Sequence, residues 1–178
     1  MSGAGLLDRR GSVLVAIDLQ ARMMGAIEGA DAIVTEAKRL IASAELLDVP
    51  VIFTEQNPAG LGRTLEDLGA RAPLEKMHFN ACAEPGFLAT IKPGQTALLI
   101  GCEAHVCVLQ TALGLIREGR RVALVADAVG SRRGTNRQAA LERAARAGTE
   151  IVTAEMVIFE WLESADHPRF REVLALVR

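Results

Sequence analysis

The sequence lacks long hydrophobic runs and a charge excess of either sign. Its longest apolar stretches, such as residues 97–100, fall far short of the roughly 18 consecutive apolar residues that a membrane-spanning helix needs. With 20 basic and 22 acidic residues the net charge is −2, so no bulk attraction to phosphate backbones or anionic lipid is expected. We therefore expect neither a membrane nor a nucleic acid among the partners.

Cysteine, histidine and glycine are too few or too scattered to form the common cofactor motifs. The three cysteines, Cys82, Cys102 and Cys107, are odd in number and have no Cys-x-x-Cys spacing, which argues against a disulfide framework and a zinc ribbon. The three histidines lack the spacing of a zinc site. No glycine-rich phosphate loop follows a strand-like run. The residues themselves thus indicate no metal and no cofactor.

What the sequence does contain is typical of one globular domain. Half of its 178 residues are hydrophobic and 24% are charged, a size and composition that predict a single domain over residues 1–178. Asp8, Arg9 and Arg10 precede a short apolar run, and no signal-peptide cleavage pattern follows it. We therefore expect a mature cytoplasmic protein with free thiols.

Short apolar runs alternate with helical patterns along the chain. Five runs have the β-branched and aliphatic composition of strands buried on both faces, namely residues 13–17, 49–54, 96–100, 122–126 and 150–152, with a weaker strand around 73–77. Apolar residues recur at helical spacing in residues 33–47, 108–118, 135–147 and 155–162. Thr135 and Gln138 match a capping box, and Pro168 is expected to open a last helix through Val177. This alternation predicts an α/β fold with a parallel sheet.

Chemically useful residues stand where these runs end, and parallel sheets bind ligands at the carboxyl ends of their strands. The first run ends at Asp18, which needs a partner for its charge or else caps the following turn. Lys76 is the candidate partner, although lysine is usually a surface residue. Cys107 begins a helical pattern, where the helix dipole stabilises a thiolate; a buried, inert cysteine is the alternative. The run over residues 122–126 ends at Asp127.

These residues stand within three ordered motifs that resemble the isochorismatase-like cysteine hydrolases. The motifs are residues 13–20, Lys76-x-x-Phe79, and residues 101–112, followed by Asp127-Ala128. The resemblance covers almost the whole chain and is greatest to the isochorismatase domain-containing branch. It implies a Rossmann-like, three-layer α/β/α sandwich on a six-stranded, mainly parallel sheet of order 3-2-1-4-5-6.

The resemblance also implies an amidase-like enzyme with the catalytic triad Asp18, Lys76 and Cys107. Asp18 would take the thiol proton and later activate water, Lys76 would hold both groups electrostatically, and Cys107 would attack an electrophilic carbon to give a thioester. The same matching implies a cis peptide bond between Cys102 and Glu103. The implied oxyanion hole consists of the backbone N–H groups of Glu103 and Cys107. The implied substrate-binding residues are Gln20, Met23, Phe79 and Ala104.

The chain departs from the family pattern in two places. Residues 54–57, Thr-Glu-Gln-Asn, replace the Asp-x-His metal motif of nicotinamidase-like relatives, which disfavours a metal-dependent nicotinamidase. Met23-Met24 stands where an aromatic residue is common, which predicts a softer pocket wall. We therefore expect a metal-independent hydrolase of a small amide or related C–N substrate, without a cofactor, and the family resemblance implies a homo-oligomer. The alternatives are a catalytically silent binding or scaffold module and a redox-sensing thiol.

Overall fold

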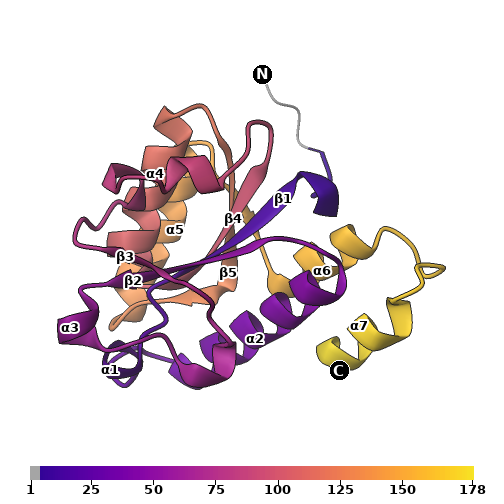
Figure 1. Ribbon diagram of the computed structural model, residues 1–178, viewed down its shortest axis with the longest axis horizontal. Coiled ribbons are helices and arrows are strands. Elements are labelled where there is room, and N and C mark those ends of the chain that lie inside the picture. The colour runs from indigo at the N-terminus through magenta and orange to yellow at the C-terminus, as the bar shows by residue number, and fades with distance from the viewer. Residues whose placement is uncertain (1–4) are drawn as a thin grey trace.

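The computed structural model describes residues 5–178, which contain a six-stranded sheet (Figure 1). The strands are β1 (Ser12–Ile17), β2 (Val51–Gln56), β3 (Leu74–Lys76), β4 (Thr96–Cys102), β5 (Arg121–Gly130) and β6 (Glu150–Val152). They lie in the order β3-β2-β1-β4-β5-β6, and each neighbouring pair is parallel. The predicted strand order and the parallel pairing are confirmed.

Helices cover both faces of the sheet and complete the predicted three-layer sandwich (Figure 1). One face carries α2 (Ala30–Leu46), α6 (Ala154–Leu162) and α7 (Phe170–Val177), and the other carries α4 (Leu109–Arg117) and α5 (Gly134–Arg146). Two short helices, α1 (Ala21–Met24) and α3 (Pro58–Leu61), and the π-helical turn η5 (Ala104–Val108) follow strand ends. Across residues 5–178, every helix is too short or too polar to cross a bilayer.

The two central strands are buried along their whole length. All six residues of β1 and all seven of β4 are buried, as expected for parallel strands that are covered on both faces. Because successive side chains of a strand point to opposite faces, Val13 and Val15 join the core beside α4 and α5, whereas Leu14 and Ala16 join the core beside α2. The sheet therefore separates two apolar cores.

The fifth strand is longer than predicted. β5 continues to Gly130 instead of ending at Asp127. Its register against β4 shifts between Leu99 and Gly101, after which Gly101 pairs with Val129. The extension thus pairs with the end of β4, which leads into η5.

Two helices begin differently from their predictions. α5 begins at Gly134, so Thr135 lies within its first turn and the predicted capping box is wrong. The carboxylate of Glu28, far away in the sequence, accepts the backbone N–H of Gly134 at 2.7 Å and takes the place of a local cap. α7 begins at Phe170 instead of Pro168, because the Phe170 N–H closes a turn onto the carbonyl of His167.

Candidate active site

The carboxyl ends of β1, β2 and β3 bring an acid, an amide and an ammonium group together. Asp18 follows β1, Gln56 ends β2 and Lys76 ends β3. Gln56 stands directly opposite Lys76 in the parallel register, so their side chains leave the sheet at the same edge. Asp18, Gln56 and Lys76 are 0%, 7% and 2% exposed. Their polar groups therefore need partners within the protein.

Asp18 and Lys76 form a buried ion pair. Lys76 Nζ lies 2.7 Å from Asp18 Oδ2, and both side chains are 0% exposed. The Thr54 hydroxyl donates to Asp18 Oδ1 at 2.7 Å, and Lys76 Nζ donates to Gln56 Oε1 at 2.6 Å. These contacts place Lys76 in the site, not on the surface. They also engage the Asp18 carboxylate in tertiary contacts, whereas the N-cap of α1 is Gln20.

The backbone around this pair is constrained at two positions. Asp18 has a φ of 52°, a left-handed conformation that few non-glycine residues adopt and that aspartate tolerates better than most. In β4, Gly101 has a φ of 113°, and a Cβ atom there would lie 1.9 Å from the carbonyl oxygen of Ile17. Only glycine therefore allows β4 to approach the end of β1 this closely.

Cys107 lies in η5, between β4 and α4. Its Sγ is 3.9 Å from Gln56 Oε1, the same oxygen that accepts a hydrogen bond from Lys76. Burial and, to a smaller extent, the Asp18 carboxylate raise the pKa of the Cys107 thiol to about 12, against the opposing effect of Lys76. Burial thus opposes the predicted stabilisation of a thiolate at the start of the helix in the resting protein. The thiol is protonated and lies near a carboxylate.

Glu103 joins β4 to η5 and carries one of the two backbone N–H groups of the predicted oxyanion hole, and Cys107, within η5, carries the other. The peptide bond between Cys102 and Glu103 is cis. The carbonyl of Glu103 accepts the backbone N–H groups of Val106 and Val108 at 3.1 and 3.3 Å. The side-chain carboxylate of Glu103 accepts hydrogen bonds from the backbone N–H of Arg132 at 2.9 Å and from Arg132 Nε at 3.1 Å. Glu103 is thus held through its backbone and its side chain.

Asp18, Gln56 and Cys107 line one pocket of about 340 Å³, a size that suits a small molecule. Of the predicted substrate-binding residues, Met23 and Phe79 line it. The pocket is completed by Arg22, Ala26, Leu61, Glu103, Val106 and Arg132.

Gln20 and Ala104, the other two predicted substrate-binding residues, are set back from the pocket wall. The Gln20 amide donates to the carbonyls of Gln56 and Gly62 and accepts the backbone N–H of Gln56. Ala104 is fully buried in the core beside α4. The structure thus places Gln20 as a support for the end of β2 and Ala104 as a packing residue.

Sequence reasoning noted Gln56 at the end of a strand without giving it a role, and it missed Arg22 and Arg132 as pocket residues. Gln56 ends a strand, which was a usable signal, but its contacts depend on the register between β2 and β3. The two arginines are exposed, and nothing in their spacing separates them from ordinary surface residues.

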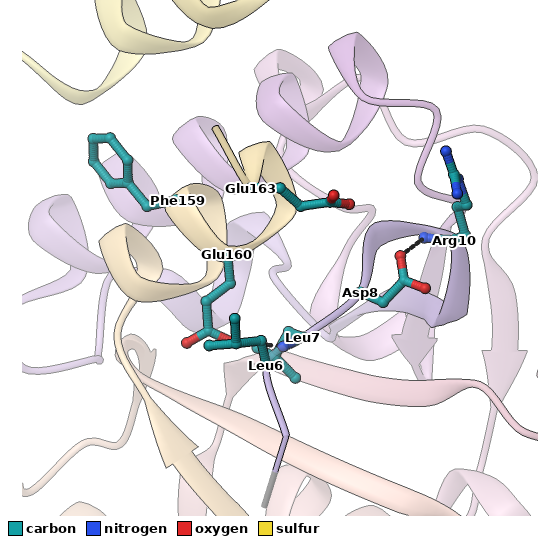
Figure 2. Close-up of a pocket in the computed structure, with 7 residues that line it drawn as sticks. All are labelled: Leu6, Leu7, Asp8, Arg10, Phe159, Glu160 and Glu163. Carbon is teal, nitrogen blue, oxygen red and sulfur yellow. Dashed lines mark hydrogen bonds between the residues drawn. The ribbon is translucent and has the colours of Figure 1, made fainter. Parts of the chain in front are cut away.

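A larger cleft of about 620 Å³ lies between the N-terminal segment and α6 (Figure 2). The backbone N–H of Leu7 donates to the Glu160 carboxylate at 2.6 Å and connects the two sides. No cysteine or lysine is found among the residues of the described chain that line this cleft, so it offers no nucleophile of that kind. Its lining residues are Leu6, Leu7, Asp8, Arg10, Phe159, Glu160 and Glu163.

Sequence and fold both match one protein family. Residues 12–156 match the isochorismatase domain. Isochorismatase domain-containing protein 2 from Danio rerio is 37% identical over 181 residues, covering 99% of this chain and 92% of the relative. A solved structure described as the MAR1 ribonuclease from Caenorhabditis elegans is 37% identical with a TM-score of 0.92, covering 97% of this chain and 92% of that one.

A more distant solved structure shares the fold. The YcaC gene product from Escherichia coli, described as an octameric hydrolase of unknown specificity, is 24% identical with a TM-score of 0.87, covering 99% of this chain and 89% of that one. The domain match and the identity to the Danio rerio relative extend over most of the residues that build the sheet and the pocket. The chain therefore belongs to the isochorismatase family.

Proposed function

We propose that this chain is a metal-independent cysteine hydrolase that cleaves a small amide or related C–N bond through a thioester on Cys107. The observation that carries the proposal is the enclosed Asp18–Lys76 pair, which shares the Gln56 amide oxygen with the Cys107 thiol. A nucleophile, a nearby carboxylate and a fixed cation in one small pocket are the groups that acyl transfer requires.

Asp18 is the proposed base in the first half of the reaction. As Cys107 Sγ forms a bond to the substrate carbonyl carbon, the thiol proton passes to the Asp18 carboxylate and the π electrons of the carbonyl move onto its oxygen. The backbone N–H groups of Glu103 and Cys107 are the proposed donors to this oxyanion, and one such donor contributes about 10²–10³-fold in other hydrolases that form a tetrahedral intermediate. The raised pKa of the resting thiol is compatible with this order, since the proton leaves as the S–C bond forms.

Asp18 returns the proton when the C–N bond breaks. The departing nitrogen takes this proton and leaves as ammonia or an amine, and the acyl group stays on Cys107 sulfur. Water then attacks the thioester while Asp18 accepts one of its protons, and that proton returns to sulfur as the C–S bond breaks. The sum is an amide plus water giving an acid plus an amine. Lys76 is the counter-ion of Asp18 whenever that carboxylate is ionised.

In the proposed reaction, side chains activate the nucleophile without a metal ion. Within residues 5–178, no group of three or more His, Cys, Asp or Glu side chains is arranged to hold a metal ion. The end of β2 supplies Gln56, whose amide contacts Lys76 and Cys107. Small-molecule binding with no added cofactor is therefore part of the proposal.

A panel of small primary amides, with ammonia release as the readout, tests this function. We expect activity in the wild type and in Cys82→Ala, a matched control because Cys82 lies outside the pocket, and loss of activity in Cys107→Ala. Activity that survives Cys107→Ala would contradict the proposed nucleophile. Binding without turnover of any amide would favour the silent binding or scaffold module. The structure from Caenorhabditis elegans is described as a ribonuclease, so an RNA oligonucleotide is included as a further substrate. We expect this RNA to remain intact.

We further propose a cytoplasmic homo-oligomer. The octameric state described for Escherichia coli YcaC supports the oligomer, as do large exposed apolar side chains such as Met77 and Phe159, which are 67% and 40% exposed. The three free cysteines suit a reducing compartment. Light scattering of the purified protein tests the assembly, and the mass of a single chain at micromolar concentration would contradict it.

A further inference from the structure

We infer that the substrate of this pocket is a short amide that carries a carboxylate at its other end, and that Arg22 anchors this carboxylate. The inference rests on the proposed function and adds to it the chemical class of the substrate. Its basis is the distribution of charge around the pocket, the way Arg22 is held, and the small volume shared by Arg22 and Cys107.

Together with the buried Lys76 that pairs with Asp18, the pocket has three cations, Lys76, Arg22 and Arg132, and two anions, Asp18 and Glu103. Its two acidic lining residues are already paired, Asp18 with Lys76 at 2.7 Å and Glu103 with Arg132 at 3.1 Å. Arg22 is the remaining charged residue of the lining, and no carboxylate in residues 5–178 forms an ion pair with it. The uncompensated positive charge favours an anionic ligand over a neutral one of the same shape.

Arg22 is positioned by the protein instead of extending freely into solvent. Its Nη1 donates to the carbonyls of Ala59 and Gly60 at 3.4 and 3.2 Å. A Cβ atom at Gly62 would lie 3.5 Å from Arg22 Cγ, so the stem of the side chain lies against this backbone. These contacts use Nη1 and leave Nε and Nη2, the edge of the guanidinium that binds a carboxylate through two parallel hydrogen bonds.

The pocket is small enough for one short ligand to reach both groups. Arg22 and Cys107 line the same volume of about 340 Å³, which is near the lower end for small-molecule sites. Met23, Leu61 and Val106 supply apolar surface in the same lining. A monoamide of a short dicarboxylic acid matches this arrangement, with its amide at the Cys107 sulfur, its methylene groups on the apolar wall and its carboxylate at Arg22.

Calorimetric titration of the Cys107→Ala variant tests the inference without turnover. The probes are succinamate and glutaramate, each compared with its neutral diamide of the same length. We expect at least one monoamide to bind about tenfold more tightly than its diamide, as for one charge-assisted contact. Adding Arg22→Gln should lower the affinity for that monoamide about tenfold and leave the affinity for the diamide within about twofold.

Two further variants test two alternatives. One distinguishes the hydrogen-bonding geometry of the guanidinium from its charge, and the other distinguishes charge at position 22 from charge elsewhere on the protein. Arg22→Lys keeps the positive charge but loses the two parallel donors of the guanidinium, so part of the preference for the monoamide should remain. Arg171→Gln removes an exposed arginine of α7, outside the pocket, and should leave the preference unchanged. Equal affinities for monoamides and diamides, a preference that Arg22→Gln does not reduce, or no binding at millimolar concentration would each overturn the inference. Failure of the proposed function would be visible separately, as amide turnover that survives Cys107→Ala.

Discussion

Lys76 and Asp18 stand at the ends of two strands that are not neighbours, yet Lys76 Nζ lies 2.7 Å from Asp18 Oδ2. β2 lies between these strands and contributes to both ends of the pair, since Thr54 donates to Asp18 and Gln56 accepts from Lys76. The ion pair is therefore built across three strands and excludes solvent. Because Gln56 also contacts Cys107, the pair is fixed beside the thiol.

Replacement of Lys76 by methionine tests the energetic role of this pair. The change leaves the Asp18 carboxylate buried without its counter-ion, so we expect the free energy of unfolding to fall by about 3–5 kcal/mol. Amide hydrolysis should fall by about 10²-fold or more, because the proposed base loses the ammonium group that holds it in place. Urea denaturation and ammonia release measure the two effects. The double variant Asp18→Asn/Lys76→Met should recover most of the stability but none of the activity, and an equally unstable double variant would contradict this account.

Glycine at position 101 is required by the approach of β4 to β1. Gly101→Ala should destabilise the fold by about 3 kcal/mol or more, because the new methyl group collides with the Ile17 carbonyl oxygen at a positive φ. Gly119→Ala is the matched control, since Gly119 also has a positive φ of 70° but a Cβ atom there would meet no other atom within 4 Å. It should cost about 1–2 kcal/mol. Similar losses in the two variants, measured by urea denaturation, would argue against the steric explanation.

The alkylation of Cys107 should depend on pH as for a thiol with a raised pKa. Because burial and the Asp18 carboxylate raise this pKa to about 12, the rate with iodoacetamide should rise about tenfold per pH unit up to pH ~10. Asp18→Asn removes a negative charge that raises the pKa, so its curve should shift to lower pH while its amide hydrolysis falls. Peptide mass spectrometry measures the rate at Cys107, and a plateau near neutral pH in the wild type would contradict the assignment.

Glu84 holds the loop that carries Phe79, and its contribution to stability should depend on pH. Hydrogen bonds from the backbone and ring of His78, and from the Met77 N–H, lower the pKa of Glu84 from 4.5 to about 2. Since the folded-state pKa is lower, the stabilisation is complete above the unfolded-state pKa and is lost as the pH falls through the folded-state pKa. The difference in unfolding free energy between wild type and Glu84→Gln should be constant above about pH 5.5 and shrink toward pH 2. A difference that grows on acidification would contradict this sign.

Much of the architecture could be predicted because it depends on local pattern. Continuous apolar runs marked the strands, and helical spacing between them required parallel crossovers. The start of α5 could not be found in this way, because its cap is the carboxylate of Glu28 from another part of the chain. The extension of β5 to Gly130 likewise depends on the irregular pairing with β4.

The candidate site was predictable in part for the same reason. Asp18 and Lys76 were found because they end or adjoin apolar runs, and the structure brings them together. The contacts of Gln56 and the protonated state of Cys107 depend on strand register and burial, which no local motif encodes. Arg22 is recognised as a candidate anchor only because both carboxylates of the pocket lining are paired with other cations. The sequence does not show this pairing.

A crystal structure of the protein soaked with a small aldehyde tests the central claim most directly, because an aldehyde adds to a reactive thiol but has no leaving group. The account predicts a covalent bond between Cys107 Sγ and the aldehyde carbon, with the resulting oxygen within hydrogen-bond distance of the backbone N–H groups of Glu103 and Cys107. An aldehyde that occupies the pocket without a bond to this sulfur, or that reacts at Cys82 instead, would contradict it.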